Sequence, residues 1–523
     1  MSKASPKSPP TYLVKCLAFT GSSLIAAAGI FALAQTKHAP PMTSRTAAML
    51  LRPLAMLLPG ANDYWHTEGP NILDRQNQPV HIAGVNWSGF ETKEAVPGGL
   101  DVQDYQSILE TIKKNGFNTI RIPLSNEMVE TPTVPKHIRF TNDAGPINTE
   151  LRNLTSIEIL DRIIDYAGQI GLKIILDNHR SEAGSSAEEN GLWYTPLYPE
   201  SAWIDDWTSL AHRYQNNSTV IGVDLRNEPH NADRGGACWD CGGAHDWHLA
   251  AERAGNAILV VNPRLLIFVE GVDNYLGDTS WWGGNLEGVR HSPIHLSIPG
   301  RLVYSVHEYG PTEYSQAWFN ESTSPATLTS MWRHRWAYIS EAGIAPVWIG
   351  EFGTPNTDAD VYSSIPGSEG QWFYSLTEFL HTHPGLGWAY WGINGEDRYG
   401  LLDANYMIQA NNKKFQALSN IHYNTAEYVR SLNIASGPVT TRRNPVVPRT
   451  SPQPAIDLTP TFATGSSNQL QAPEVSLKTN ATAGHRGTRS ADPTVKSAIA
   501  ADIRQAVRTA DLSLEGDVRT LQR

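Results

Sequence analysis

Cysteine is scarce in this 523-residue sequence, basic residues do not outnumber acidic ones, and no apolar run beyond residue 34 is long enough to span a membrane. The formal net charge is −11, which argues against nucleic acid or an anionic membrane as a partner, because both are bound through clustered Lys and Arg. A hydrophobic content of 40% and a charged content of 18% indicate a globular protein with a large core. A neutral substrate fits this composition better than an anionic one.

Residues 1–34 have the pattern of a secretory signal peptide. A lysine-containing start precedes the uncharged stretch CLAFTGSSLIAAAGIFALA, which runs from Cys16 to Ala34 and closes on the small-residue pattern Ala-Leu-Ala. We therefore expect export, with cleavage after Ala34. An uncleaved membrane anchor is the alternative, because a stretch of about 19 residues just spans a bilayer.

Only Cys238 and Cys241, in the segment ACWDC, remain if Cys16 leaves with the signal. A lone C-x-x-C pair is compatible with a redox pair or half a zinc site, but tetrahedral zinc needs more ligands and the sequence has no second pair. In an exported protein, a disulfide closing a short loop is the better interpretation. We therefore predict a Cys238–Cys241 disulfide.

Composition divides the rest of the chain into a spacer, a domain and a tail. Residues 35–61 are rich in Ala, Pro, Ser and Thr and are typical of a spacer, whereas residues 62–433 carry the apolar patterning of a folded domain, beginning with a hairpin-like segment. Residues 434–523 turn to Pro, Ser, Thr, Ala and Arg, and Phe462 is the only aromatic residue after 441. This composition predicts a disordered tail, and a tail without Trp or Tyr makes a poor sugar-binding module.

Eight apolar runs alternate with helix-like segments inside the domain. The runs cover residues 81–87, 118–124, 173–179, 220–227, 265–271, 301–309, 346–352 and 386–394. Between two of them, Thr155 and Glu158 form a capping-box pattern ahead of apolar residues at helical spacing. Continuous apolar runs indicate strands buried on both faces, as in a parallel sheet covered by helices. The pattern predicts an α/β fold, a (β/α)₈ TIM barrel with an N-terminal β-hairpin cap. A doubly wound sheet is the alternative, although no Gly-rich phosphate loop follows the first run.

Polar side chains gather at the carboxyl ends of these runs, where a barrel of this kind places its working residues. They are Asn86, Trp87, Arg121, Asp177, Asn178, His179, Asn227, Glu228, Glu270, His307, Glu308, Tyr309, Glu351, Trp391 and Asn394. Several carboxylates beside many tryptophans, with no credible metal set and no cofactor motif, fit hydrolysis of a glycosidic bond, because one carboxyl protonates the leaving oxygen while another attacks or activates water. Trp faces offer flat platforms for sugar rings, with candidates in GLWY, SWWGGN and at Trp391. The residues alone do not choose between Glu228 and Glu270.

The segments DLRNEPH (224–230) and WIGEFGTP (348–355) resemble the strand-four and strand-seven motifs of glycoside hydrolase family 5, whose barrel members are retaining β-glycanases. The resemblance covers about residues 64–421. In this region the sequence is particularly similar to the bacterial secreted endo-β-1,4-glucanases of the family. It implies that Glu228 is the general acid/base and Glu351 the nucleophile. It also implies substrate-binding or supporting roles for Arg121, His179, Asn227, His307, Tyr309 and Trp391.

The resulting hypothesis is a secreted retaining endo-β-1,4-glucanase acting on cellulose or related β-glucans, with a β-linked polysaccharide as its partner and no partner protein implied. Another β-glycanase of the family, such as a β-mannanase or a glycolipid glycosidase, and a catalytically dead sugar-binding barrel are the alternatives. The hypothesis requires two carboxyls about 5 to 5.5 Å apart across the barrel mouth. We further expect Glu228 to hold a proton near neutral pH while Glu351, facing Arg121, stays charged.

Overall fold

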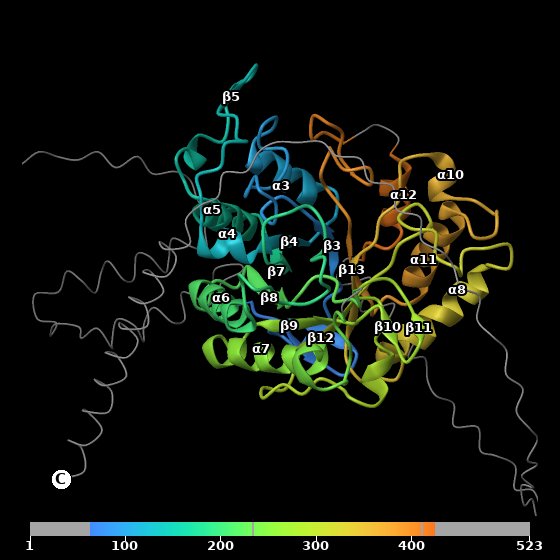
Figure 1. Ribbon diagram of the computed structural model, residues 1–523. Helices are drawn as coiled ribbons and strands as arrows, with labels where there is room; N and C mark the ends of the chain where they lie inside the picture. The colour runs from blue at the N-terminus through green and yellow to red at the C-terminus, as the bar shows by residue number, and fades with distance from the viewer. Residues whose placement is uncertain (1–62, 233–234, 409–411, 424–523) are drawn as a thin grey trace, which may run out of the picture. The chain divides into compact units, whose positions relative to one another are not determined.

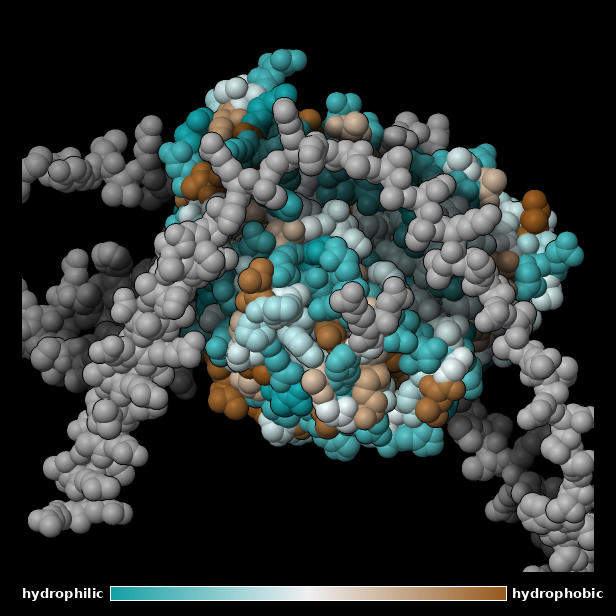
Figure 2. Space-filling model, viewed as in Figure 1, coloured by the Kyte–Doolittle hydropathy of each residue, from teal (hydrophilic) through white to brown (hydrophobic). Residues whose placement is uncertain are grey.

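The computed structural model describes residues 63–232, 235–408 and 412–423. The predicted signal peptide (1–34), spacer (35–61) and tail (434–523) lie outside these residues, as do residues 424–433 of the predicted domain. Among the described residues, no helix is both long and apolar enough to cross a membrane. In the view of Figure 2 the surface of the described part is largely hydrophilic, with apolar side chains scattered over it.

Eight parallel strands close into a barrel in the order β12-β13-β14-β3-β4-β7-β8-β9, which confirms the predicted fold. Figure 1 shows these strands at the centre and the longer helices around them. The strands are β3 (Ala83–Asn86), β4 (Thr119–Ser125), β7 (Lys173–Arg180), β8 (Val220–Asp224), β9 (Leu266–Glu270), β12 (Leu302–His307), β13 (Val347–Glu351) and β14 (Gly387–Tyr390). Each strand overlaps one of the eight predicted apolar runs.

Helices follow the strands and bury one face against them. They are α3 (Tyr105–Lys114), α4 (Asn126–Glu130), α5 (Ser156–Gln169), α6 (Glu200–Arg213), α7 (Trp247–Val261), α8 (Pro325–Trp332), the π-helix η4 (Arg333–Ala337), α9 (Tyr338–Glu341), α10 (Asp358–Val361), α11 (Glu369–Thr382) and α12 (Lys413–Ser419). Short 3₁₀ segments are η1 (Thr149–Leu151), η2 (Gly243–His245) and η3 (Glu287–Arg290). The predicted capping box precedes α5, where the backbone N–H of Thr155 donates to Glu158 Oε2 at 2.8 Å.

A hairpin of β1 (His66–Glu68) and β2 (Asn71–Leu73) precedes the barrel, as predicted. Its residue Ile72 and the preceding Trp65 are buried in one apolar cluster with barrel residues such as Ile175 and Trp348. The hairpin thus covers part of the barrel core on the side away from the strand ends that carry the polar residues. Two further hairpins decorate loops: β5 (Thr141–Asn142) with β6 (Gly145–Pro146), and β10 (Asn274–Tyr275) with β11 (Asp278–Thr279).

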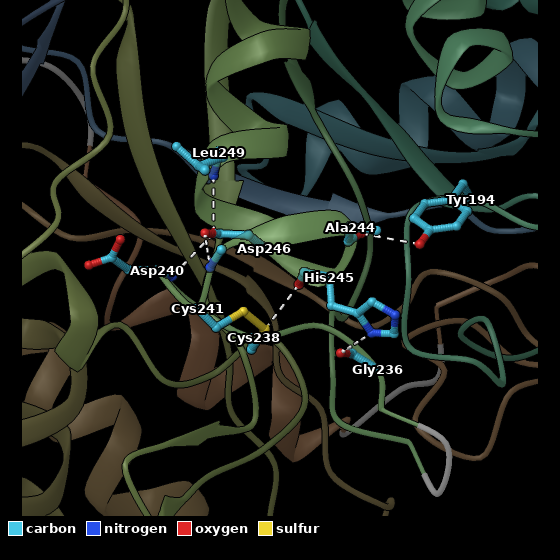
Figure 3. The surroundings of a disulfide bond; sticks show 10 residues. Tyr194, Gly236, Cys238, Asp240, Cys241, Ala244, His245, Asp246 and Leu249 are labelled. Carbon is cyan, nitrogen blue, oxygen red and sulfur yellow. Dashed lines mark hydrogen bonds between the residues drawn. A yellow bond between two sulfur atoms is a disulfide. The ribbon is translucent and has the colours of Figure 1, made fainter.

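The loop after β8 carries the predicted disulfide between Cys238 and Cys241 (Figure 3). The buried carboxylate of Asp246 accepts hydrogen bonds from the backbone N–H groups of Asp240 at 3.1 Å, Gly242 at 2.8 Å and Leu249 at 3.3 Å. Because Asp246 is also the N-cap of α7, it joins the disulfide loop to the start of that helix.

Candidate active site

A cleft of about 690 Å³ opens at the carboxyl ends of the barrel strands. Six of the eight predicted catalytic and substrate-binding residues line it: His179, Asn227, Glu228, Tyr309, Glu351 and Trp391. The other two, Arg121 and His307, are fully buried and contact cleft residues from below. The fold therefore brings together residues that are up to 270 positions apart, from Arg121 to Trp391.

The two predicted catalytic carboxyls face the same histidine. Glu228 lies four residues beyond the end of β8, and Glu351 is the last residue of β13. His307 Nδ1 lies 3.0 Å from Glu228 Oε1 and 3.6 Å from Glu351 Oε2. One oxygen of each carboxyl lies within 4.8 Å of an oxygen of the other. Both groups can therefore reach a single sugar unit bound in the cleft.

Arg121 is the charged centre beneath the cleft. Its guanidinium lies 2.6–3.2 Å from oxygens of Asn86, Asp177, Asp224, Asn227, Glu270 and Glu351. Burial alone acts to lower the pKa of Arg121, but the surrounding carboxylates outweigh it and raise this pKa, so the guanidinium stays charged. Its shortest contact, 2.6 Å, is with Glu351 Oε1.

The surroundings of the two carboxyls shift their pKa values in opposite directions. Burial raises the pKa of Glu228 to about 7, the charges of Glu351 and Glu270 add to the rise, and the hydrogen bond with His307 opposes it. For Glu351, burial acts in the same direction, but the charges of His307 and Arg121 and the hydroxyl of Tyr309, which donates to Oε2 at 2.9 Å, leave its pKa below the usual value. Near neutral pH one carboxyl therefore retains a proton while the other is charged, as expected from the sequence.

His307 lies between the accessible carboxyl of Glu228 and the buried carboxyl of Glu270. Burial acts to lower its pKa, but the charges of Glu270 and Glu351 raise it well above the usual value. The ring is therefore an imidazolium, with Nδ1 directed at Glu228 and Nε2 placed 3.2 Å from Glu270 Oε1.

His179 and Trp391 form one wall of the cleft. Their rings are stacked, with centroids 5.6 Å apart and planes 19° from parallel. Burial lowers the pKa of His179 to about 3, so the ring is neutral, and its Nδ1 is bonded to Asp177 Oδ2 at 2.8 Å. The indole Nε1 of Trp391 donates to Asp397 Oδ2 at 3.2 Å, which fixes the plane of the indole. A fixed aromatic face beside two carboxyls is suited to hold a sugar ring.

The tryptophans that are candidate sugar platforms divide between the cleft and the core. Trp281 and Trp282 line the cleft, and Trp282 is 43% exposed and stacked on His230. Trp193 is fully buried and packs against Trp247, so it fills the core and is not a platform.

Sequence reasoning missed part of the cleft wall, which comes from the loops after β12 and β14. There Glu313 forms an ion pair with Arg398 and accepts a hydrogen bond from the hydroxyl of Tyr399 at 3.0 Å. The Tyr399 ring stacks on Tyr309, with centroids 6.0 Å apart. These residues follow no strand-end pattern, and only their polar and aromatic character within long loops could have drawn attention to them.

Three groups of potential metal-ligand atoms cluster within 4.8 Å among the described residues: Glu228, His307 and Glu351; Asp177, Asp224 and Glu270; and Asp278, Glu287 and His334. In the first group the imidazolium of His307 has no free lone pair for a metal. The second group surrounds Arg121, whose guanidinium already supplies the positive charge. In the third group, His334 already forms an ion pair with Glu287, and Arg335 forms one with Asp278.

A (β/α)₈ barrel whose strand ends bring two carboxyls together beside a stack of aromatic side chains is the architecture of a glycoside hydrolase. The profile of the family "Cellulase (glycosyl hydrolase family 5)" matches residues 73–397. The chain belongs to glycosyl hydrolase family 5, the cellulase family.

Similar proteins agree with this assignment. An endoglucanase of Paenibacillus polymyxa is 46% identical over 345 residues, which are 65% of this chain and 82% of the relative. The major extracellular endoglucanase of Xanthomonas campestris is 33% identical over 368 residues, covering 68% of this chain and 72% of the relative. A solved complex of an endocellulase from Pyrococcus horikoshii with cellotetraose has a TM-score of 0.62 at 33% identity, and covers 69% of this chain and 99% of that chain.

Proposed function

We propose that the protein is a secreted, retaining endo-β-1,4-glucanase that hydrolyses cellulose or related β-glucans by double displacement. The single observation that carries the mechanism is the approach of the two carboxyls, with oxygens of Glu228 and Glu351 within 4.8 Å of one another. Retaining enzymes hold their carboxyls about 5 to 5.5 Å apart, whereas inverting enzymes leave about 6.5 to 9.5 Å for a water molecule.

In the first step, the charged carboxylate of Glu351 attacks the anomeric carbon of the sugar bound on Trp391. The bond between that carbon and the glycosidic oxygen breaks, and Glu228 transfers its proton to the departing oxygen. Arg121 and Tyr309 hold Glu351 charged and oriented before the attack, through contacts of 2.6 and 2.9 Å. The product of this step is a glycosyl ester on Glu351.

In the second step Glu228, now a carboxylate, takes a proton from water. The resulting nucleophile attacks the same carbon and breaks the ester, which restores the charge of Glu351 and the proton of Glu228. Asn227 contacts Arg121 Nη2 at 3.1 Å and lines the cleft next to Glu228, so its amide is placed to bond a sugar hydroxyl. His179 and Trp391 position the ring.

The substrate and the location are supported by the relatives and by the N-terminus. The relatives named above are endoglucanases or an endocellulase, one of them in complex with cellotetraose and one called extracellular. The sequence of residues 1–34 has the features of an export signal, and the disulfide between Cys238 and Cys241 fits an oxidising compartment. Assays on carboxymethylcellulose, mannan and xylan test the substrate, and a preference for mannan would favour the β-mannanase alternative.

Two substitutions test the residue roles. Replacing Glu351 with Gln removes the nucleophile and should lower turnover on cello-oligosaccharides by several orders of magnitude. Replacing Glu228 with Gln should cost on the order of 10² to 10⁴, because general acid catalysis contributes about that factor. Activity near that of the unsubstituted enzyme in either variant would contradict the assigned roles, and no activity in the unsubstituted enzyme on any β-glycan would favour a sugar-binding barrel.

A further inference from the structure

Glu270 is a third carboxylate close to the catalytic pair, yet it does not reach the cleft. It is the last residue of β9 and its side chain is 0% exposed, whereas that of Glu228 is 18% exposed. The substrate therefore cannot touch Glu270, and any effect of Glu270 on the reaction must pass through its neighbours.

Three nitrogen atoms from three different parts of the barrel surround the Glu270 carboxylate, two through hydrogen bonds and one, His307 Nε2, through an ion pair. Oε1 lies 3.2 Å from Arg121 Nη2 and 3.2 Å from His307 Nε2. Oε2 accepts the backbone N–H of Glu228 at 2.8 Å. A carboxylate attracts all three groups through its charge, whereas a glutamine is neutral and must present its NH₂ group to at least one of them.

The backbone of Glu228 needs such support. Its φ angle is +50°, in the left-handed region that residues other than Gly, Asn and Asp adopt rarely. The loop after β9 packs tightly on the same spot, because a Cβ atom on Gly283 would lie 2.2 Å from Glu270 Oε2 and 3.4 Å from Glu228 Cα. This glycine lets the loop close over the bond between Glu270 and the Glu228 backbone.

We propose that Glu270 is a positioning residue for the acid/base: Oε2 fixes the left-handed backbone of Glu228, and Oε1 orients His307 so that its Nδ1–H is directed at Glu228 Oε1. This inference rests on the proposed role of Glu228. Since His307 donates to Oε1, the acidic proton of Glu228 resides on Oε2. Glu270 thus decides, without touching the sugar, where the proton for the leaving oxygen is held.

The test compares substrates that differ in their need for that proton. The value of kcat/KM reports the first chemical step, so it is measured for Glu270→Gln with cellotetraose and with 2,4-dinitrophenyl β-cellobioside, whose leaving group departs without protonation. We expect a loss of about 10²-fold for cellotetraose, since misplacing a catalytic group by about 1 Å costs that much, and a loss below about fivefold for the aryl substrate.

Glu308→Gln is the matched control. Glu308 is also fully buried and adjoins His307 in sequence, but its Oε1 accepts from the indole of Trp336 at 2.9 Å, toward η4. Loss of this carboxylate should lower kcat/KM by the same small factor for both substrates. Thermal unfolding of each variant monitors the fold, and Glu270→Asp, which keeps the charge, replaces Glu270→Gln if that variant does not fold.

Equal losses on the two substrates, or no loss on either, would overturn the positioning role of Glu270. Glu228→Ala separates this outcome from failure of the proposed function. If Glu228 is the acid/base, this variant must keep most of its kcat/KM on the aryl substrate, whose leaving group needs no proton. If Glu228→Ala also lost both activities equally, the assignment of the acid/base would be wrong, whatever Glu270 does.

Discussion

Substituting Lys for Arg121 isolates the geometric part of the buried charge network, because it keeps the positive charge and removes the guanidinium fork. The guanidinium reaches six side-chain oxygens at 2.6–3.2 Å, whereas an ammonium has three N–H donors at one point. At least half of these contacts must therefore be lost. The carboxylates left without a donor are buried and cannot turn to solvent.

The expected cost follows from the burial of these groups. Because the positive charge is kept, the cost comes from buried oxygens left without a donor, and at roughly 1 to 1.5 kcal/mol for each of three lost contacts it amounts to about 3 to 5 kcal/mol. At roughly 2 °C per kcal/mol for a domain of this size, Tm should fall by roughly 6 to 10 °C at pH 7. Arg213→Lys is the control, since Arg213 pairs with Asp161 at the surface, where such a pair contributes about 1 kcal/mol or less.

The decrease in Tm caused by Arg121→Lys should also be larger at high pH than at low pH. Burial already raises the pKa of Asp177 to about 7 and that of Asp224 to about 6, and loss of donors raises both further. A carboxyl with a raised pKa in the folded state stabilises the fold at low pH, and this stability is lost as pH rises through that pKa. Differential scanning calorimetry at pH 5 and pH 8 should therefore find a larger deficit at pH 8. A Tm within about 2 °C of the parent at both pH values would refute the reasoning.

Three further outcomes are expected. The pH profile of kcat/KM should be bell-shaped, with a basic limb near pH 7 set by Glu228 and an acidic limb below about pH 4.5 set by Glu351. A basic limb above pH 9 would contradict the acid/base assignment. Arg398→Glu and Glu313→Arg should each raise KM for cellotetraose a few-fold, and the double exchange should bring KM most of the way back. Additive increases in KM would argue that the ion pair in the cleft wall does not contribute to substrate binding. Replacing both cysteines of the disulfide with serine should cost about 2 kcal/mol by loop entropy, read as a Tm decrease of roughly 4 °C, and an unchanged Tm would contradict this contribution.

Sequence patterns predicted the barrel because each strand is buried on both faces and so forms a continuous apolar run. The boundaries were less accurate where the backbone leaves the sheet. The apolar run of residues 220–227 predicts one strand, but β8 ends at Asp224. Beyond it, the Asn227 N–H still bonds the carbonyl of Asn178 at 3.0 Å, and Glu228 then turns to positive φ.

The positive φ of Glu228 also explains why the sequence pattern alone does not show which of two strand-end glutamates faces the cleft. Glu228 and Glu270 follow similar apolar runs, but the left-handed backbone of Glu228 presents its side chain to the cleft, while Glu270 points beneath it. A φ angle at a single glutamate has no signature in composition or periodicity, so family resemblance made the distinction. The same limit applies to Trp193 and Trp282, whose burial depends on tertiary packing.

The stereochemistry of hydrolysis tests the central claim most directly. Proton NMR of the first products released from cellotetraose distinguishes the two anomers before they interconvert. Two carboxyls as close as Glu228 and Glu351 predict that the β-anomer appears first, since two successive displacements at one carbon restore its configuration. Initial release of the α-anomer would show a single displacement by water and would contradict the account.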